Sequence, residues 1–223
     1  MNTSLTNTAR LLGAGLRALL VLTVVTGVLY PLVVTGIAQG LFAGKANGSE
    51  IESHGEVVGS SLIGQAYNLP LKKGQETPEP DLKWFQGRPQ NGLGSNSVNT
   101  QYKLILSGAT NRSADNAELV QWIKDAKAAV VKDNSVPGHP VNPSDVPADA
   151  VTSSGSGLDP SISPNYADLQ VHRVAERNGL PADRVQKLVD EHTEGRTLGF
   201  MGEPRVNVLE LNIALKDLAA ADR

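Results

Sequence analysis

The residues best suited to chemistry in this chain lie in one stretch rich in serine and glycine. Residues 151–164 read VTSSGSGLDPSISP. Glycine allows the close approach and the positive φ with which successive backbone amides can surround an anion, here at Ser154, Gly155, Ser156 and Gly157. Asp159-Pro160 then predicts a rigid turn. The stretch is therefore a candidate anion-binding loop. The alternative is a tight structural loop that leads into a helix at Tyr166.

A second candidate is the segment GFMGEPR at residues 199–205. Glu203 and Arg205 flank Pro204, so a short, stiff piece of chain carries two opposite charges. These charges either bind a partner or pair with neighbouring groups and solvent, which is the commoner fate of exposed charges.

Motifs for catalysis and for metal binding are missing from the sequence. The histidines share no metal-ligand spacing and no cysteine accompanies them. There is no G-x-x-x-x-G-K-[ST] phosphate loop, no G-x-S-x-G nucleophile elbow, and no Asp-Lys-Thr-Gly sequence for an aspartyl phosphate. We therefore expect no catalytic centre and no metal site. The histidines are His54, His139, His172 and His192, and the last two are expected at the surface or its boundary.

An apolar segment near the N-terminus predicts attachment to a membrane. Ala18 to Ala38 form 21 consecutive positions without a charged side chain. At roughly 1.5 Å per residue, a helix of this length spans about 31 Å, the thickness of a bilayer's hydrocarbon core. We predict one transmembrane helix over residues 18–41. The alternative is a cleaved signal peptide, because Ala38-Gln39-Gly40 resembles a small-x-small cleavage site, but the apolar stretch is longer than the core of such peptides.

Basic residues near this segment predict its orientation. Arg10 and Arg17 precede it, and Lys45 alone follows it closely. Because basic residues favour the cytoplasmic side, residues 1–17 are predicted to be a short cytoplasmic N-terminus and residues 42–223 an extracytoplasmic domain.

Small residues recur along the predicted membrane helix and favour contact with another helix. Thr23, Gly27, Pro31 and Thr35 are spaced by four, and Gly36 and Gly40 form a G-x-x-x-G motif. Small side chains let helices approach closely in lipid. The alternative is that glycine is simply common in such helices. We predict that Thr23, Gly27, Pro31, Gly36 and Gly40 contact a partner helix.

The composition indicates a slightly acidic domain with an aliphatic core. Hydrophobic residues make up 40% of the chain, aromatic residues only 4%, and the net charge is −3. No stripe of basic residues is present, so nucleic acid is not an expected partner.

The pattern of the outer part predicts one helix-rich α+β domain. We expect one or two short strands in residues 56–67 and mostly turns in residues 69–99. Ser113 is predicted to cap a helix that runs to about Val131, with Leu119, Trp122, Ile123, Ala126 and Val130 on its inner stripe. Prolines exclude a regular helix from residues 133–164.

Three further helices are predicted at the C-terminal end. The first turns Ala167, Val171, Val174 and Ala175 inward and His172, Arg173, Glu176 and Arg177 toward water, and it ends at Gly179. The second begins at Pro181, and the third begins at Asn207 as N-cap, with Glu210 three residues later.

Several stretches of the chain resemble the C subunit of the Kdp-type potassium-transporting ATPase. The resemblance is strongest from Val151 to Leu215, and it extends upstream to the membrane segment, so it covers nearly the whole chain. The stretches are YPLVVTGIAQ (30–39), GSSLIGQ (59–65), WFQGRP (84–89), VTSSGSGLDPSISP (151–164), QVHRVAERNGL (170–180) and HTEGRTLGFMGEPRVNVLELNIAL (192–215). Within them, Arg88, Glu203 and Arg205 are candidates for contact with a partner surface.

The middle of the chain departs from the family's pattern. SGATNRSADNAEL at residues 107–119 keeps only part of the family's SGGSNLGPTNPEL, and a Gly/Asn-rich insertion at residues 91–100 precedes it. The lost glycine and proline are expected to alter the turns there.

This resemblance implies an accessory, non-catalytic subunit of an ATP-driven potassium importer in a bacterial plasma membrane, needed for assembly of the complex. The implied partners are a channel-like subunit that selects potassium, a P-type subunit that hydrolyses ATP, a small single-helix subunit, and membrane lipid. The family's C subunit is also described as a catalytic chaperone that raises the ATP affinity of the pump subunit. In that description the loop of Ser154, Gly155, Ser156, Gly157, Leu158 and Asp159 is compared with the signature sequence of ABC transporters. ATP is thus an implied ligand, potassium is the ion that the complex transports, and no tightly bound cofactor is expected.

The predicted orientation conflicts with a direct contact to ATP, because it places this loop outside the cell. An alternative from another class is a stand-alone, membrane-anchored extracytoplasmic binding protein or hydrolase, which would work without partner subunits.

Overall fold

A computed structural model describes residues 3–75, 77–95 and 105–222 of the chain. The chain divides into two units, Met1–Glu50 and Ile51–Arg223. Part of the Gly/Asn-rich insertion, residues 96–100, lies outside the described residues.

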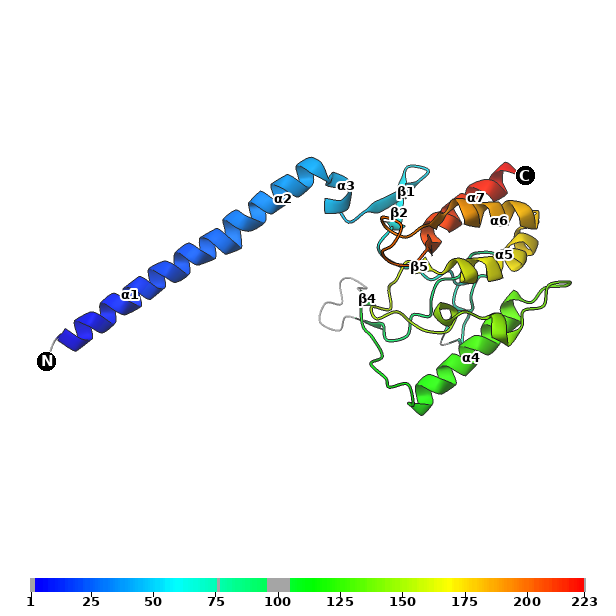
Figure 1. The fold of residues 1–223 in the computed structure, drawn as a ribbon, viewed down its shortest axis with the longest axis horizontal. Coiled ribbons are helices and arrows are strands. Elements are labelled where there is room, and N and C mark those ends of the chain that lie inside the picture. The colour runs from blue at the N-terminus through cyan, green and yellow to red at the C-terminus, as the bar shows by residue number, and fades with distance from the viewer. Residues whose placement is uncertain (1–2, 76, 96–104, 223) are drawn as a thin grey trace. The chain divides into compact units, whose positions relative to one another are not determined.

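Unit 1 is one continuous helical rod followed by a short helix (Figure 1). The rod consists of α1 (Thr3–Val24), a π-helical turn η1 (Val25–Leu29) and α2 (Tyr30–Leu41), and α3 (Ala43–Ala46) follows it. Residues Thr6–Leu41 form a helix long and apolar enough to cross a membrane. The helix therefore begins well before the predicted start at Ala18.

Pro31 explains the π-helical turn. A proline has no amide hydrogen, so it cannot donate the usual bond to the carbonyl four residues earlier, and its ring crowds that carbonyl. The helical turn before Pro31 contains one extra residue instead, so the amide of Tyr30 donates to the carbonyl of Val25, five residues earlier. The wider turn contains Gly27, so two of the predicted partner-contact residues lie at this irregularity.

Unit 2 confirms the predicted α+β class. Its strands are short: β1 (Glu50–Ser53) pairs with β2 (Glu56–Ser60), and β3 (Gly94–Ser95) pairs with β4 (Ile105–Leu106). A three-stranded antiparallel sheet has the order β5-β7-β6, formed by Ser161–Ile162, Arg205–Asn207 and Thr193–Glu194. The helices are α4 (Ala117–Asn134), α5 (Pro164–Asn178), α6 (Ala182–Glu191) and α7 (Val208–Ala221), with 3₁₀ turns η2 (Pro143–Asp145) and η3 (Ala148–Ala150).

The ends of these helices show which local signals were read correctly. Asn207 caps α7 by accepting from the amides of Leu209 and Glu210, and Gly179 ends α5 in the left-handed conformation, as predicted. The N-cap of α4 was predicted wrongly. Asn116, not Ser113, accepts from the amide of Leu119, because the Ser113 hydroxyl donates to Asp115 instead.

The core of unit 2 is aliphatic and lies among α5, α6, α7 and the three-stranded sheet (Figure 1). Helices α5 and α6 place valines in it, and α7 adds leucines. Phe85, from the extended segment before α4, is fully buried in the same cluster. The residues concerned are Val171, Val174, Val185, Val189, Leu211, Leu215 and Phe85.

Arg173 was predicted to face water, and this prediction is wrong. Its side chain is among the most deeply buried in the protein, with 1% exposed. Its guanidinium donates to Asn134 Oδ1 at 2.8 Å, to Gln170 Oε1 at 2.6 Å, to the Trp84 carbonyl at 3.0 Å, and to the Leu82 carbonyl. Burial lowers the pKa of Arg173 to about 10, so the group stays charged at neutral pH.

This arginine belongs to a set of polar side chains that bind the backbone of residues 82–86. Gln170 accepts from the Gln86 amide at 2.7 Å and donates to the Gln86 carbonyl at 3.1 Å. Asn212 of α7 does the same for Phe85, at 2.9 and 3.0 Å. Because the segment pairs with no strand, these side chains satisfy the backbone groups that would otherwise be buried without partners.

A stacked histidine pair predicts how stability changes with pH. The rings of His139 and His172 are 3.6 Å apart between centroids and nearly parallel. Burial, and then repulsion from His139, lower the pKa of His172. The folded protein therefore binds fewer protons than the unfolded chain just below the unfolded pKa of about 6.5. We therefore expect the free energy of unfolding to be highest above about pH 6.5 and to decrease as the pH falls toward the pKa of His172 in the folded protein.

Replacing His172 with phenylalanine should flatten this part of the stability curve, because phenylalanine does not titrate. Thermal unfolding of the full-length chain at a series of pH values measures the effect. Ala128→Ser, at an exposed position, adds no group that titrates in this range; it is the control and should keep the wild-type slope. An unchanged slope in the His172 variant would contradict the assignment.

Candidate functional site

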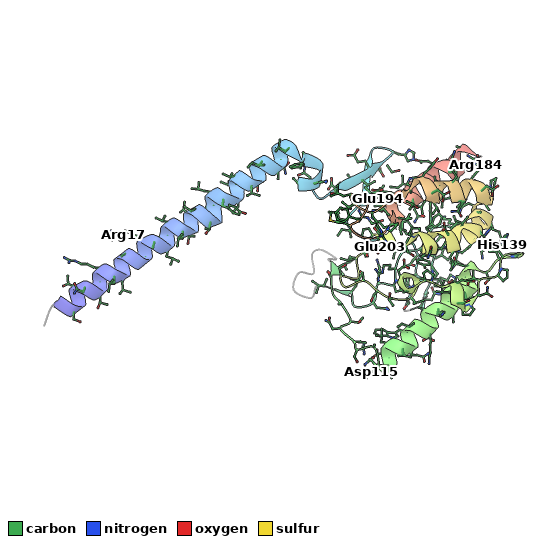
Figure 2. The ribbon with its side chains drawn as sticks, viewed as in Figure 1. Arg17, Asp115, His139, Arg184, Glu194 and Glu203 are labelled. Atoms are coloured by element: carbon green, nitrogen blue, oxygen red, sulfur yellow. The ribbon has the colours of Figure 1, made fainter. Side chains whose placement is uncertain are left out.

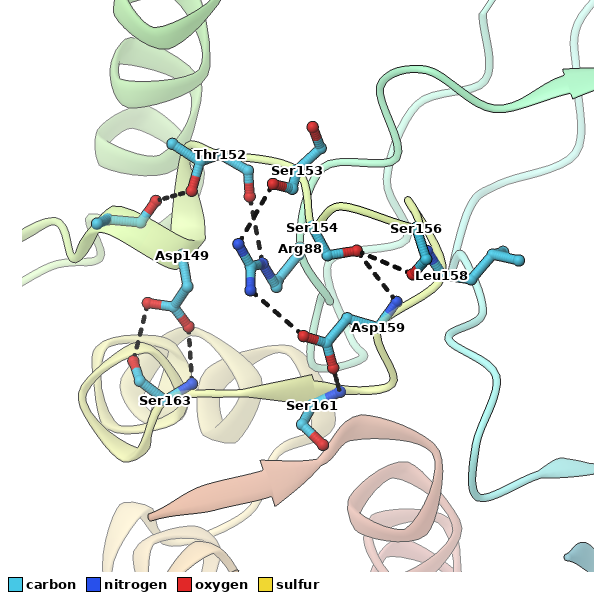
Figure 3. Close-up of polar contacts among 11 residues, drawn as sticks. Arg88, Asp149, Thr152, Ser153, Ser154, Ser156, Leu158, Asp159, Ser161 and Ser163 are labelled. Carbon is cyan, nitrogen blue, oxygen red and sulfur yellow. Dashed lines mark hydrogen bonds and ion pairs between the residues drawn. The ribbon is translucent and has the colours of Figure 1, made fainter. Parts of the chain in front are cut away.

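The Ser/Gly loop is held from one side by Arg88 (Figure 3). The Arg88 guanidinium donates to the carbonyls of Thr152 and Ser153 and to Asp159 Oδ2, each at 3.3 Å. One side chain thus joins the beginning and the end of the loop. Arg88 was predicted as a partner-surface residue; the structure shows that it positions this loop, and its contact with a partner stays a prediction.

Within the loop, the serines bind backbone groups of the loop itself (Figure 3). Ser154 Oγ accepts from the Asp159 amide at 3.3 Å, and Ser156 Oγ accepts from the Leu158 amide at 3.1 Å. The amide of Gly157 donates to the Ser154 carbonyl at 3.2 Å. Of the four amides predicted to surround an anion, that of Gly157 therefore binds within the loop instead.

Neighbouring segments pack against the loop at glycines. Gly157 has φ +70° and is buried, and a side chain there would collide with Leu93 at 2.7 Å. The Ser156 carbonyl accepts from the Gly108 amide at 3.2 Å and from Ser107 Oγ at 2.9 Å. On another side, the Gly64 amide donates to the Leu158 carbonyl at 2.8 Å. Contacts from three segments far apart in the sequence thus fix the loop's shape.

Replacing Gly64 with alanine should destabilise the protein. The added Cβ would lie 2.5 Å from the Asp159 carbonyl oxygen, a backbone atom that cannot move independently of the loop. Overpacking of this kind costs about 1–3 kcal/mol. Thermal unfolding of the full-length chain measures it. Gly195→Ala is the matched control, since its Cβ would meet nothing within 4 Å. Equal melting temperatures for the two variants would contradict this packing.

An open groove of about 820 Å³ lies beside the loop and brings several predicted site residues together. Arg88 and Asp159 line it on the loop side, while Glu203 lines it from the segment before β7 and Arg205 from the start of β7 itself. Other lining residues include Leu62, Asp149, Glu194 and Glu210.

The charges of the groove are mostly paired within the chain. Glu203 accepts from Arg196 at 2.9 Å, and Arg205 binds Glu194 at 2.8 Å. All four side chains are about half exposed or more, so these pairs contribute little to stability. The structure therefore shows Glu203 and Arg205 paired with neighbours, which was the second of the two alternatives. Their contact with a partner stays a prediction.

The arginine that holds the loop is not free to bind a nucleotide. A triphosphate requires cations or several free amides, and the cation beside the loop, Arg88, is already paired with Asp159. The exposed part of the loop consists of Gly155 and Ser156. Direct binding of ATP stays a prediction that this geometry does not favour.

The predicted partner-helix residues lie along the rod of unit 1. All five are exposed, and a side chain built at Gly36 or Gly40 would meet nothing within 4 Å. At Gly27 the nearest atom is a Thr23 methyl at 3.9 Å. In the described part of unit 1, nothing near these three positions therefore requires a glycine.

Sequence reasoning missed two features. The first is the buried set of Gln170, Arg173 and Asn212, for which helical periodicity gave no signal. The second is the exposed turn of Leu198, Phe200 and Met201, whose signal was present as three large apolar residues between glycines. Among the described residues, no group of three His, Asp or Glu side chains could hold a metal ion.

Comparison with known proteins gives a consistent result along nearly the whole chain. Residues 12–217 match the family model described as "K+-transporting ATPase, c chain". A potassium-transporting ATPase KdpC subunit from Streptomyces coelicolor is 82% identical over 99% of this chain and 98% of its own length. The proteins of the same name from Gemmatimonas aurantiaca and Kineococcus radiotolerans are 45% and 41% identical, over 92% and 98% of this chain and 94% and 100% of their own lengths. The chain therefore belongs to the KdpC family, the c chains of K⁺-transporting ATPases.

Proposed function

We propose that this accessory subunit of the potassium-import complex holds partner subunits together without a catalytic centre of its own. Its helix crosses the membrane with the N-terminus in the cytoplasm, and unit 2 lies outside. The partners are the channel-like subunit, the P-type pump subunit and the small single-helix subunit implied by the family resemblance. The observation that carries the proposal is the family match over residues 12–217, which includes both the membrane helix and unit 2.

Two features of the chain support a role in assembly. Glycines on the membrane helix have open space around them, as a closely packed neighbouring helix requires. In addition, the Ser/Gly loop is braced on several sides and behaves as a rigid structural unit.

The effect on ATP affinity is best explained as indirect. We infer that contacts between subunits raise the affinity of the pump subunit, since the proposed orientation separates unit 2 from the cytoplasmic nucleotide. Titration of the full-length chain in detergent with a fluorescent ATP analogue tests this inference. We expect no saturable binding, and a saturable signal lost on Gly155→Leu would instead support direct contact through the loop.

Two measurements test the proposed function as a whole. The chain contains no cysteine, so Ser4→Cys and Ala128→Cys variants each carry one thiol for labelling. A membrane-impermeant maleimide should label residue 128 but not residue 4 in intact cells. The tagged chain should also co-purify with the other ATPase subunits, and its deletion should prevent growth at limiting potassium. Labelling at residue 4 alone would contradict the proposed orientation, whereas an active chain that purifies without partners would favour the stand-alone binding protein.

A further inference from the structure

The exposed apolar residues of unit 2 are concentrated outside its four helices. Among the residues that the structure describes, each large hydrophobic side chain exposed in unit 2 belongs to residues 57–71, 105–106 or 198–201. The first two stretches lie at the Ser/Gly loop and its groove: Gly64 and Gly108 bond to the loop, and Leu62 lines the groove. The third stretch ends two residues before Glu203, which also lines the groove. The largest exposures are those of Leu198 at 78% and Phe200 at 71%.

The turn that carries Leu198 and Phe200 holds these side chains away from the core. Thr197 and Met201 exchange backbone hydrogen bonds of 2.9 and 3.0 Å, which leaves residues 198–200 as the tip of the loop. Leu198 itself has φ +55°, a left-handed conformation that L-residues other than asparagine, aspartate and glycine rarely adopt. Both the backbone conformation of Leu198 and the exposure of its side chain to water are unfavourable in the isolated chain. This combination indicates that Leu198 contacts another molecule.

The base of this turn is braced by ion pairs. Arg196 and Glu203 form an ion pair between the two segments that lead into and out of the turn. Arg205 and Glu194 form a second ion pair between the same segments, further from the tip. Figure 2 shows Glu194 and Glu203 near one another, well away from His139. These ion pairs hold the two segments that carry the apolar tip in a defined conformation before a partner binds. Less conformational entropy is therefore lost on binding.

The groove beside the base of this turn has an excess of negative charge. It is lined by the carboxylates of Asp149, Asp159, Glu194, Glu203 and Glu210 and by the guanidiniums of Arg88 and Arg205. The first four carboxylates bind groups of the chain itself. Among the described residues, the Glu210 carboxylate binds none, while its backbone amide donates to Asn207.

We propose that the tip of Leu198, Phe200 and Met201 and the adjoining groove form one docking surface for another protein subunit of the ATPase. The occupant is an apolar segment of that subunit with a lysine or arginine at its edge. Its apolar side chains cover the tip, and its cation lies in the groove beside Glu210. This inference rests on the proposed function, because it requires that the chain assemble with other subunits.

The groove's charge favours a protein over a lipid surface as the occupant. Loops that insert into bilayers usually carry an excess of lysine and arginine that attracts anionic headgroups. Here the arginines beside the tip are paired with glutamates, and the groove adds further negative charge. An anionic membrane would repel this surface, whereas a cationic side chain on a protein complements it.

A double variant, Leu198→Asn with Phe200→Ser, tests the surface without threatening the fold. Asparagine tolerates the left-handed conformation, so the melting temperature of the full-length chain should stay equal or rise. Retention of the tagged chain in the complex should fall by roughly tenfold or more, as expected for the loss of central apolar contacts. Ala128→Asn, on the exposed face of α4, is the control and should leave retention unchanged. Glu210→Gln should make retention less sensitive to salt.

Photo-crosslinking identifies the occupant. In the intact complex, p-benzoylphenylalanine placed at Phe200 should crosslink to another subunit, and the same probe at Ala128 should not. A crosslink to lipid alone, or no crosslink at Phe200 in a complex that the wild-type chain joins normally, would overturn the docking surface and leave the proposed function intact. Failure of the wild-type chain to join any complex would overturn both.

Discussion

Replacing Arg173 with methionine should destabilise the folded protein by about 3–5 kcal/mol, because it leaves several acceptors without their donor at a cost of roughly 1–3 kcal/mol for each buried one. Methionine has similar length but no donor. The carbonyls of Leu82 and Trp84 and the side-chain oxygens of Asn134 and Gln170 would lose a donor, and two of these four contacts are buried while the other two are partly buried. Each unsatisfied buried group costs roughly 1–3 kcal/mol, although relaxation and entering water recover part of it. Since domains are stable by only about 5–15 kcal/mol, this change is a large fraction of the total.

Guanidinium-induced unfolding of the full-length chain in detergent measures this loss. Fluorescence is a suitable signal because the Trp84 carbonyl accepts from Arg173, so the indole reports on the affected segment. Arg177→Met, one turn further along α5 and exposed, is the matched control and should change stability by less than about 0.5 kcal/mol. Arg173→Lys should also be strongly destabilising, because one ammonium cannot reach four divergent acceptors. If Arg173→Met and Arg177→Met unfold at the same denaturant concentration, the buried arginine is not needed for the fold.

Local signals in the sequence predicted the helices of unit 2 well. Asn207, Gly179 and the apolar spacing of α5 each act through neighbours within a few residues, so the sequence alone contains the information. The same holds for the apolar helix of unit 1. The N-cap of α4 was misplaced because Ser113 and Asn116 are both good caps, and only the contact of Ser113 with Asp115 distinguishes them.

Contacts between distant segments could not be predicted in this way. Arg173 follows the polar side of a helical pattern, yet the segment around Trp84 lies over that side and buries it. No local rule indicates that residues 82–86 lack a strand partner and need donors from α5. The bracing of the Ser/Gly loop depends likewise on Gly64 and Gly108, which are about 95 and 50 residues away in the sequence. Glycine content suggested an anion cup; in the structure Gly157 packs closely against Leu93, while a side chain at Gly155 would meet nothing within 4 Å.

Replacing Gly27, Gly36 and Gly40 together with leucine should prevent assembly of the potassium-import complex. Within the chain, these positions have open space, and leucine is a better helix former than glycine. The isolated helix should therefore be at least as stable and as apolar as before. A neighbouring helix that packs against the glycines would instead meet three large side chains and could not approach closely. We expect the tagged variant to reach the membrane in normal amounts, to co-purify with little or none of the other subunits, and to fail to support growth at limiting potassium.

The control for this experiment changes side-chain size on the same helix without adding bulk at glycine. Leu19→Val with Leu22→Val keeps the segment apolar and should assemble normally, since both side chains are exposed in the chain. Restoring one glycine at a time then locates the contact. Recovery at Gly27 alone would place the partner at the π-helical turn near Pro31, and recovery at Gly36 and Gly40 would place it about one and a half to two and a half turns further along α2. Normal assembly and growth of the triple variant would show that the helix only tethers unit 2 to the membrane, so that the contacts holding the complex together would have to come from unit 2.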